Sequence, residues 1–202
     1  YSPLKVDETP VYTFTITAQN QPVIVDMYRA LDEDGSVSYL YRDRGDFFVK
    51  GLYCYDESGN GLPNEFVFCE FFTKSVLMGV TFIEQEAKRK SPKTWQPPVM
   101  YLQDGQSALA AVWPLFLREY QNEITLLMEY AFCTHTYFNR KIGDLRLRQI
   151  LLNAGVPEQW MWLFKRKTQE GLEVYDLTSA AVRAVLLVWQ GFVHGVSDAH
   201  AQ

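Results

Sequence analysis

Two short stretches of the sequence carry side chains that could do chemistry at close spacing. In the first, Cys133 precedes His135 by two residues, and a thiol beside an imidazole is a pair that nucleophilic catalysis uses. If residues 122–138 form a helix, however, the two side chains point about 200° apart and cannot pair. A different histidine would be needed, and only His194 and His200 remain. We therefore predict no catalytic residues at these positions.

The second stretch is "FIEQEAK", residues 82–88, in which Glu86 and Lys88 stand at the end of an expected strand. Metal-dependent nucleases combine carboxylates that hold Mg²⁺ with a lysine that steadies the scissile phosphate. The spacing is common by chance, and an exposed strand end with mixed charges explains it more simply. A nuclease or other hydrolase using these two residues stays open as an alternative.

Sequence signatures of metal and cofactor sites are not found. The chain has three histidines and three cysteines, with no Cys-x-x-Cys, no His-x-x-x-His and no glycine-rich nucleotide loop. We therefore predict no metal and no cofactor. Cys54, Cys69 and Cys133 lie in apolar contexts, which is typical of buried free thiols in a reducing compartment, so we expect a cytoplasmic protein. A disulfide between Cys54 and Cys69 across a hairpin stays open.

Charge is distributed unevenly along a chain whose net charge is −5. Residues 1–70 carry twelve acids against five bases, whereas residues 140–168 carry seven bases against two acids. A nucleic-acid-binding face is therefore one alternative function. The residues that would contact phosphate are Arg146, Arg148, Lys165, Arg166 and Lys167. The simpler explanation is a solvated helix surface.

The segment "LLNAGVPEQWMWLFKRK", residues 151–167, raises the question of a helix-turn-helix. Trp160 and Trp162 would then stand where a recognition helix offers polar side chains to base edges. Large apolar groups cannot make those hydrogen bonds. The segment therefore predicts a corner between packed helices rather than a sequence-specific reader of DNA.

The first half of the chain alternates apolar and polar residues with period two, which predicts strands. Turn sequences separate the segments, among them "AQNQ" and "DEDG". The expected strands are 11–17, 22–30, 36–42, 47–56, 65–72, 75–86 and 99–103, and an amphipathic helix is the alternative for 75–86. Short polar turns between them predict an antiparallel sheet of about five to seven strands.

The second half changes to a helical period of 3.6 residues. The expected helices are 105–119, 122–138, 144–153, 157–169 and 178–196, with Pro114 interrupting the first, Asp144 and Ser179 as N-caps, and 153–155 ending the third. The most apolar tract, 180–196, is too short and too polar to span a membrane, so we predict no membrane association. The fold class predicted is α+β, with a β-rich region 1–103 and about four to five helices in 104–202 packed on it around one shared core.

Aromatic residues are 15% of the chain and gather in the expected strands and in the 157–169 helix. Aromatic side chains anchor many protein interfaces, so the sequence favours a non-enzymatic interaction module of the inhibitor, immunity-protein or assembly-factor type. Its expected partner is another protein, bound by acidic and aromatic surface. The partner-binding residues predicted are Trp160, Trp162, Phe71 and Tyr55. One tryptophan of the pair is expected in the core and the other at the surface.

Overall fold

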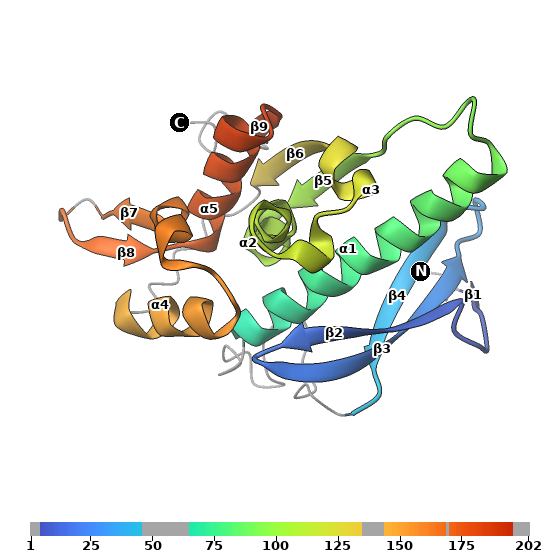
Figure 1. The fold of residues 1–202 in the computed structure, drawn as a ribbon, viewed down its shortest axis with the longest axis horizontal. Helices are drawn as coiled ribbons and strands as arrows, with labels where there is room; N and C mark the ends of the chain where they lie inside the picture. Colours follow the sequence, from blue (N-terminus) through green and yellow to red (C-terminus); the bar gives the residue numbers. More distant parts are fainter. Residues whose placement is uncertain (1–4, 46–64, 135–143, 169, 196–202) are drawn as a thin grey trace. The chain divides into compact units, whose positions relative to one another are not determined.

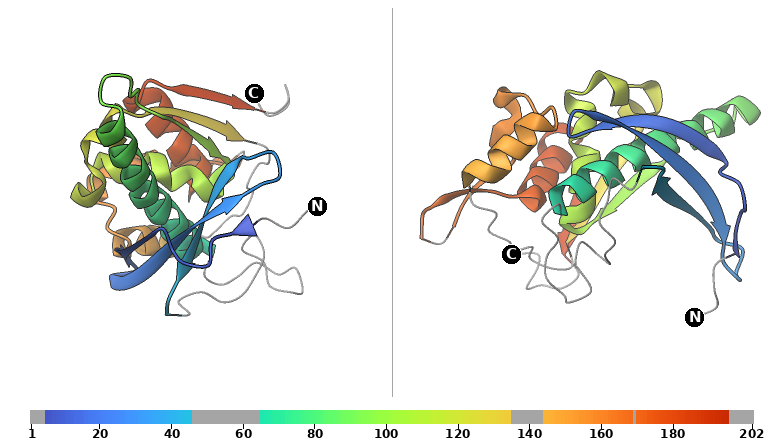
Figure 2. Two further views of the ribbon diagram at one scale, coloured as in Figure 1. Left: turned by 90° about the vertical axis from the view of Figure 1, so that its right-hand side faces the viewer. Right: turned by 90° about the horizontal axis from the view of Figure 1, so that it is seen from below.

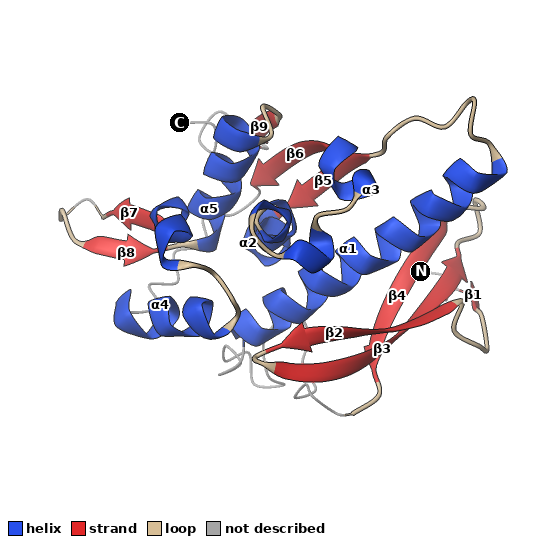
Figure 3. Ribbon diagram, in the orientation of Figure 1, coloured by secondary structure: helices blue, strands red, loops and turns tan. Residues whose placement is uncertain are grey.

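The computed structural model describes residues 5–45, 65–134, 144–168 and 170–195 (Figure 1). It divides into two compact units, Tyr1–Gly79 and Val80–Gln202. The division falls within the helix of residues 65–90. The sequence pattern itself changes from strands to helices after residue 103. The chain mixes antiparallel strands, helices and a separate parallel sheet (Figure 3). The predicted combination of an antiparallel sheet with helices is therefore confirmed, and the parallel sheet is the feature that sequence reasoning missed.

Four strands form the antiparallel sheet of the first unit. They are β1 (Lys5–Val6), β2 (Tyr12–Ala18), β3 (Gln21–Leu31) and β4 (Val37–Asp43), with β3 paired to each of the others. Gln19 and Asn20 join β2 to β3 with φ angles of 49° and 61°, the positive values of a two-residue hairpin turn. The predicted strands 11–17, 22–30 and 36–42 are confirmed, while the predicted strand 47–56 lies outside the described residues.

Residues 65–90 form the long helix α1 (Glu65–Lys90), so the strands predicted at 65–72 and 75–86 are wrong. The aromatic content of "EFVFCEFF" suggested β-structure, but its buried residues Phe66, Cys69, Thr73 and Leu77 recur at helical spacing. Only the alternative considered for 75–86 anticipated a helix. By length and composition this helix could cross a bilayer, yet half of its most apolar window is buried within the structure, as in a core helix.

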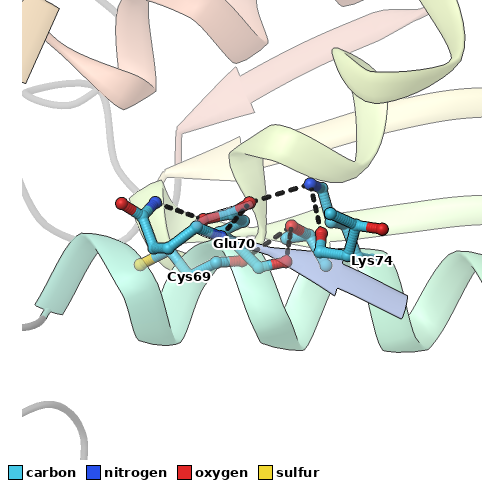
Figure 4. Close-up of polar contacts among 6 residues, drawn as sticks. Cys69, Glu70 and Lys74 are labelled. Carbon is cyan, nitrogen blue, oxygen red and sulfur yellow. Dashed lines mark hydrogen bonds and ion pairs between the residues drawn. The ribbon is translucent and has the colours of Figure 1, made fainter. Parts of the chain in front are cut away.

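A buried ion pair joins α1 to the first hairpin (Figure 4). Lys74 Nζ lies 2.8 Å from Glu70 Oε1, and the two side chains are 2% and 0% exposed. The same ammonium group donates to the carbonyl of Thr17 at 2.7 Å. Gln19 donates from its side-chain amide to Glu70 Oε2 at 2.5 Å and from its backbone N–H to Oε1 at 3.3 Å. The pair thus holds the strained turn residue in place.

The outer side of the same sheet carries a second ion pair, between Asp26 and Arg44. The Arg44 guanidinium donates to both oxygens of Asp26, at 2.6 and 2.8 Å, and Thr13 donates to the same carboxyl group at 2.5 Å. Hydrogen bonding from Arg44 is the main reason that the pKa of Asp26 lies below its usual 3.8, although burial opposes the shift. The carboxylate is therefore stabilised in its charged form.

Replacing Asp26 with asparagine is expected to lower the free energy of unfolding by about 1–2 kcal/mol at pH 7, because a charge-assisted bond becomes a neutral one. The pKa of Asp26 is lower in the folded protein than in the unfolded chain. Its ionised carboxyl group therefore stabilises the fold at pH values above the unfolded-state pKa, and this stabilisation is lost as pH falls through the folded-state pKa. The free energies of unfolding of the wild type and of Asp26→Asn should therefore differ by a constant amount above about pH 5 and converge below pH 3.8. Urea unfolding across this range measures the difference, and a gap that widens toward low pH would contradict it.

The second unit contains a parallel sheet in the order β5-β6-β9 (Figure 2). Its strands are β5 (Val99–Gln103), β6 (Glu129–Thr134) and β9 (Phe192–Gly195). A strand was predicted at 99–103, but as part of the antiparallel sheet. The helices predicted at 122–138 and 178–196 are only partly correct, since each leads into a strand of this sheet. Strand β6 is buried without alternation, and such a strand is hard to distinguish from a helix in sequence.

Short helices cover one face of the parallel sheet. They are α2 (Asp104–Ser107), the 3-10 helices η1 (Ala108–Ala111), η2 (Trp113–Leu115) and η3 (Arg118–Tyr120), α3 (Glu123–Leu127), and α5 (Leu177–Arg183) with its π-helical continuation η5 (Ala184–Val188). The single helix predicted at 105–119 is thus a chain of short turns. Asp176 caps α5 by accepting from Thr178 N–H, in place of the predicted Ser179. Met100, Leu102, Tyr130 and Phe132 point into this core.

The remaining described residues confirm the predicted helix corner but not the long helix expected after it. Helix α4 (Asp144–Asn153) ends at Gly155, whose φ is +94° and whose N–H bonds the carbonyl of Leu152. The predicted helix 157–169 is instead the 3-10 helix η4 (Glu158–Leu163) and then strand β7 (Lys165–Lys167), which pairs with β8 (Glu173–Tyr175). The Arg183 side chain donates to the carbonyls of Trp162 and Leu163 at 2.8 Å, and thereby stabilises the end of η4.

Candidate functional site

The carboxyl ends of the parallel strands define the candidate site. In open parallel sheets ligands bind outside the carboxyl ends of the strands, where loops present polar groups. Here β5 ends at Gln103, β6 at Thr134 and β9 at Gly195, and all three strands run in the same direction. Any ligand-binding groups of the second unit are expected at this edge.

Asp104 follows β5 directly and occupies an unusual backbone conformation. Its φ is +56°, in the left-handed region that non-glycine residues seldom adopt. The Ser107 hydroxyl stabilises this turn by donating to the carbonyl of Gln103 at 2.6 Å and to that of Asp104 at 3.1 Å. Strained residues of this kind gather at functional sites, where the surrounding structure holds them. The half-buried Asp104 carboxyl group is therefore the leading functional side chain at this edge.

A second polar cluster lies on the sheet face that the helices leave open. The Tyr101 hydroxyl and His194 Nε2 are 2.7 Å apart, and their rings approach to 5.7 Å between centroids. Between them, on β6, lies Cys133, which is the register partner of His194. A hydrogen bond with this thiol, together with burial, raises the pKa of Tyr101. Strands β5, β6 and β9 each contribute one member of the cluster.

Sequence reasoning considered Cys133 in the wrong setting. It placed the residue on a helix and rejected a pair with His135 for that reason, whereas Cys133 lies on a strand. His135 is outside the described residues. The histidine that does approach Cys133 is His194, 61 positions later, and only the pairing of β6 with β9 brings them together. No local signal in the sequence distinguishes this strand from a helix, because its residues 130–134 are all buried.

Three of the four predicted partner-binding residues lie in the described part of the chain. Phe71 is 5% exposed, so its ring is unable to contact a partner. Trp162 is 44% exposed, and Trp160 is half-buried with its ring 6.1 Å from that of Phe116. Tyr55 lies outside the described residues. Of the three described residues, Trp162 has the most exposed side chain.

The predicted basic cluster is largely neutralised by neighbouring acids. Its ion pairs join Arg148 to Glu158 at 2.6 Å, Lys165 to Glu173 at 2.8 Å, and Arg166 to Asp176 at 3.3 Å. Lys167 is exposed, and the side chain of Arg146 lies outside the described part of the chain. Bases held by acids have less charge to offer to phosphate groups.

The predicted nuclease residues lie on α1 rather than at a strand end. Glu86 pairs with Lys90 at 2.8 Å, and this hydrogen bond lowers the pKa of its carboxyl group. Lys88 instead contacts Glu123 at 2.5 Å and lies 4.9 Å from the centre of the Trp95 ring. Within the described residues, no group of three His, Cys, Asp or Glu side chains is placed to hold a metal ion.

Comparison with known proteins identifies a structural likeness without a sequence family. No protein-family model matches the sequence, and no curated protein matches it either. Among solved structures, the chain is similar to the catalytic domain of starch synthase IV from Arabidopsis thaliana, bound to ADP and acarbose. The TM-score is 0.61 at 14% sequence identity, over 90% of this chain and 33% of the other. The shared feature is the fold, and this chain spans about a third of the matched structure.

This likeness corrects the function predicted from the sequence. A non-enzymatic interaction module was favoured because no catalytic motif was visible and aromatic residues were abundant. The fold is instead similar to part of the catalytic domain of a starch synthase. Of the aromatic residues that suggested a partner surface, Phe66 and Phe71 are buried in the structure.

Proposed function

We propose that this chain is part of a glycosyltransferase, and that the carboxyl end of the β5-β6-β9 sheet contributes to its ligand pocket. The observation that carries the proposal is the fold likeness over 90% of the chain to a catalytic domain solved with ADP and acarbose. A parallel sheet with loops at its carboxyl end is also the usual setting for such ligands. Because the chain spans a third of that structure, it supplies part of the site.

Asp104 is the residue that we assign to ligand contact. An ionised carboxyl group accepts hydrogen bonds only, and the hydroxyl groups of a sugar or ribose can donate them. The short turn tied by Ser107 limits the directions in which Asp104 can point, so the ligand finds its acceptor already oriented. Ligand binding therefore carries little entropic cost for ordering the Asp104 side chain.

Direct binding of ADP and of acarbose to the purified chain tests the proposal. We expect calorimetry or ligand-observed NMR to detect at least one of them. Asp104→Ala should weaken it by about 10- to 150-fold, since a hydrogen bond to a charged group contributes about 1.5–3 kcal/mol. Glu33→Gln, in the exposed turn between β3 and β4, is the matched control and should bind as the wild type does.

The two parts of the proposal fail separately. If a folded chain binds neither ADP nor acarbose, its assignment to a glycosyltransferase pocket is wrong. If a ligand binds equally well to the wild type and to Asp104→Ala, the pocket lies elsewhere.

A further inference from the structure

Three potential metal ligands of different chemical types converge on the open face of the parallel sheet. Cys133 supplies a sulfur, His194 an imidazole nitrogen and Tyr101 a phenolic oxygen. The three residues lie on β6, β9 and β5, with Cys133 directly opposite His194 in the parallel register. No two of them are neighbours in sequence, so the sheet pairing alone assembles the cluster.

Small side chains on the middle strand allow this convergence. Ala131 and Cys133 alternate along the same face of β6 and are 9% and 1% exposed. Tyr101, from one flanking strand, reaches His194 on the other, with 2.7 Å between the hydroxyl oxygen and Nε2. Tyr101 is itself 48% exposed, whereas Cys133 is 1% exposed, so a cation reaches the sulfur only when the exposed side chains beside it move.

We propose that Cys133, His194 and Tyr101 form a binding site for a borderline-soft divalent cation such as Zn²⁺. Thiolate and imidazole are the ligands such cations prefer, and the phenolic oxygen supplies the third donor from the protein. On binding, the thiol loses its proton to solvent, and the cation replaces the hydrogen bonds that now join the three side chains. Water completes the coordination.

The spacing between the Tyr101 hydroxyl oxygen and His194 Nε2 is close to what a cation requires. Two ligand atoms of a tetrahedral zinc site are about 3.3 Å apart, given metal–ligand distances near 2.0 Å. The hydroxyl oxygen of Tyr101 and Nε2 of His194 therefore need to separate by about half an ångström. Both side chains are exposed enough to make that adjustment by rotation, without moving the strands.

The other described cysteine provides a matched control. Cys69 lies on α1 in the first unit, where its side chain is 2% exposed. Among the described residues His194 is the one histidine, so a cation bound through both sulfur and nitrogen is expected at Cys133 rather than at Cys69. This inference does not depend on glycosyl transfer, and its test uses no nucleotide or sugar.

Titration with Co²⁺, a spectroscopic substitute for Zn²⁺, tests the proposal on the reduced, intact chain. We expect one equivalent to bind with a sulfur-to-cobalt charge-transfer band, which Zn²⁺ then abolishes by displacement. Cys133→Ser should eliminate the band, and His194→Ala should weaken binding at least tenfold. Cys69→Ser should leave both the charge-transfer band and the Co²⁺ affinity unchanged. Affinity should rise with pH, because binding releases the thiol proton.

Each contrary result overturns the proposal. If the wild type shows no charge-transfer band at excess Co²⁺, the cluster is only a hydrogen-bonded contact. A band that persists in Cys133→Ser would place the cation on another cysteine. Far-UV circular dichroism confirms the fold of each variant, and His194→Ala, altered at an exposed side chain, tests the site if Cys133→Ser does not fold.

Discussion

Replacing Lys74 with methionine is expected to lower the free energy of unfolding by about 3–5 kcal/mol, the usual cost of leaving one partner of a buried ion pair alone. The Glu70 carboxyl group would be left at 0% exposure without its ammonium partner, with only the amide groups of Gln19 as remaining donors from the hairpin. The Thr17 carbonyl would also lose the ammonium group that now donates to it. Urea denaturation monitored by circular dichroism measures the loss.

Two further variants separate the buried charge from lost packing. Glu70→Leu combined with Lys74→Met removes both charges, and we expect it to be more stable than Lys74→Met alone. Lys90→Met breaks the exposed pair with Glu86 on the same helix and should cost less than about 1 kcal/mol. A Lys74→Met variant no less stable than Lys90→Met would mean that the buried pair contributes little.

The second large effect is expected from Gly191→Ala, with a loss of about 3 kcal/mol or more, at the upper end of what overpacking costs. A Cβ atom at position 191 would lie 1.8 Å from the backbone oxygen of Tyr130 and 3.1 Å from Cγ1 of Val185. A backbone oxygen on a central strand is unable to move aside as a flexible side chain could. The variant should therefore displace β9 from β6, and thermal unfolding should show a lower midpoint.

Gly45→Ala is the matched control, because a Cβ atom there meets nothing within 4 Å. It should leave stability unchanged or raise it by about 0.4–1 kcal/mol through the reduced entropy of the unfolded chain. If Gly191→Ala and Gly45→Ala unfold at the same temperature, the close approach of residue 191 to β6 is not a constraint on the fold.

Local signals in the sequence were sufficient for some elements. The alternating run at 11–17, its turn and its partner strand were predicted because each strand has one wet face, which leaves a period of two. Helix α4 and its end at Gly155 were predicted because a glycine with positive φ marks a helix end. In these cases a few neighbouring residues suffice to favour one backbone conformation.

Elements buried on both sides were misread. Strand β6, whose residues from Tyr130 to Thr134 are all buried, carries no alternation, and the sequence "EYAFCT" fits a helix equally well. Helix α1 shows the converse error, because its aromatic residues have high strand propensity although the segment is helical and is buried on several sides near its start. Propensity is a weak guide where tertiary packing decides.

The sequence by itself determined the mixed composition of the fold, the first hairpin, helix α4 and the burial of Cys69, since these depend on local pattern and composition. Only the tertiary structure decided which residues meet. Tyr101, Cys133 and His194 come together through the register of three parallel strands, and Glu70 reaches Gln19 across 51 positions. Parallel strands need long crossover connections, so the residues that form a site on them lie far apart in sequence and leave no local motif.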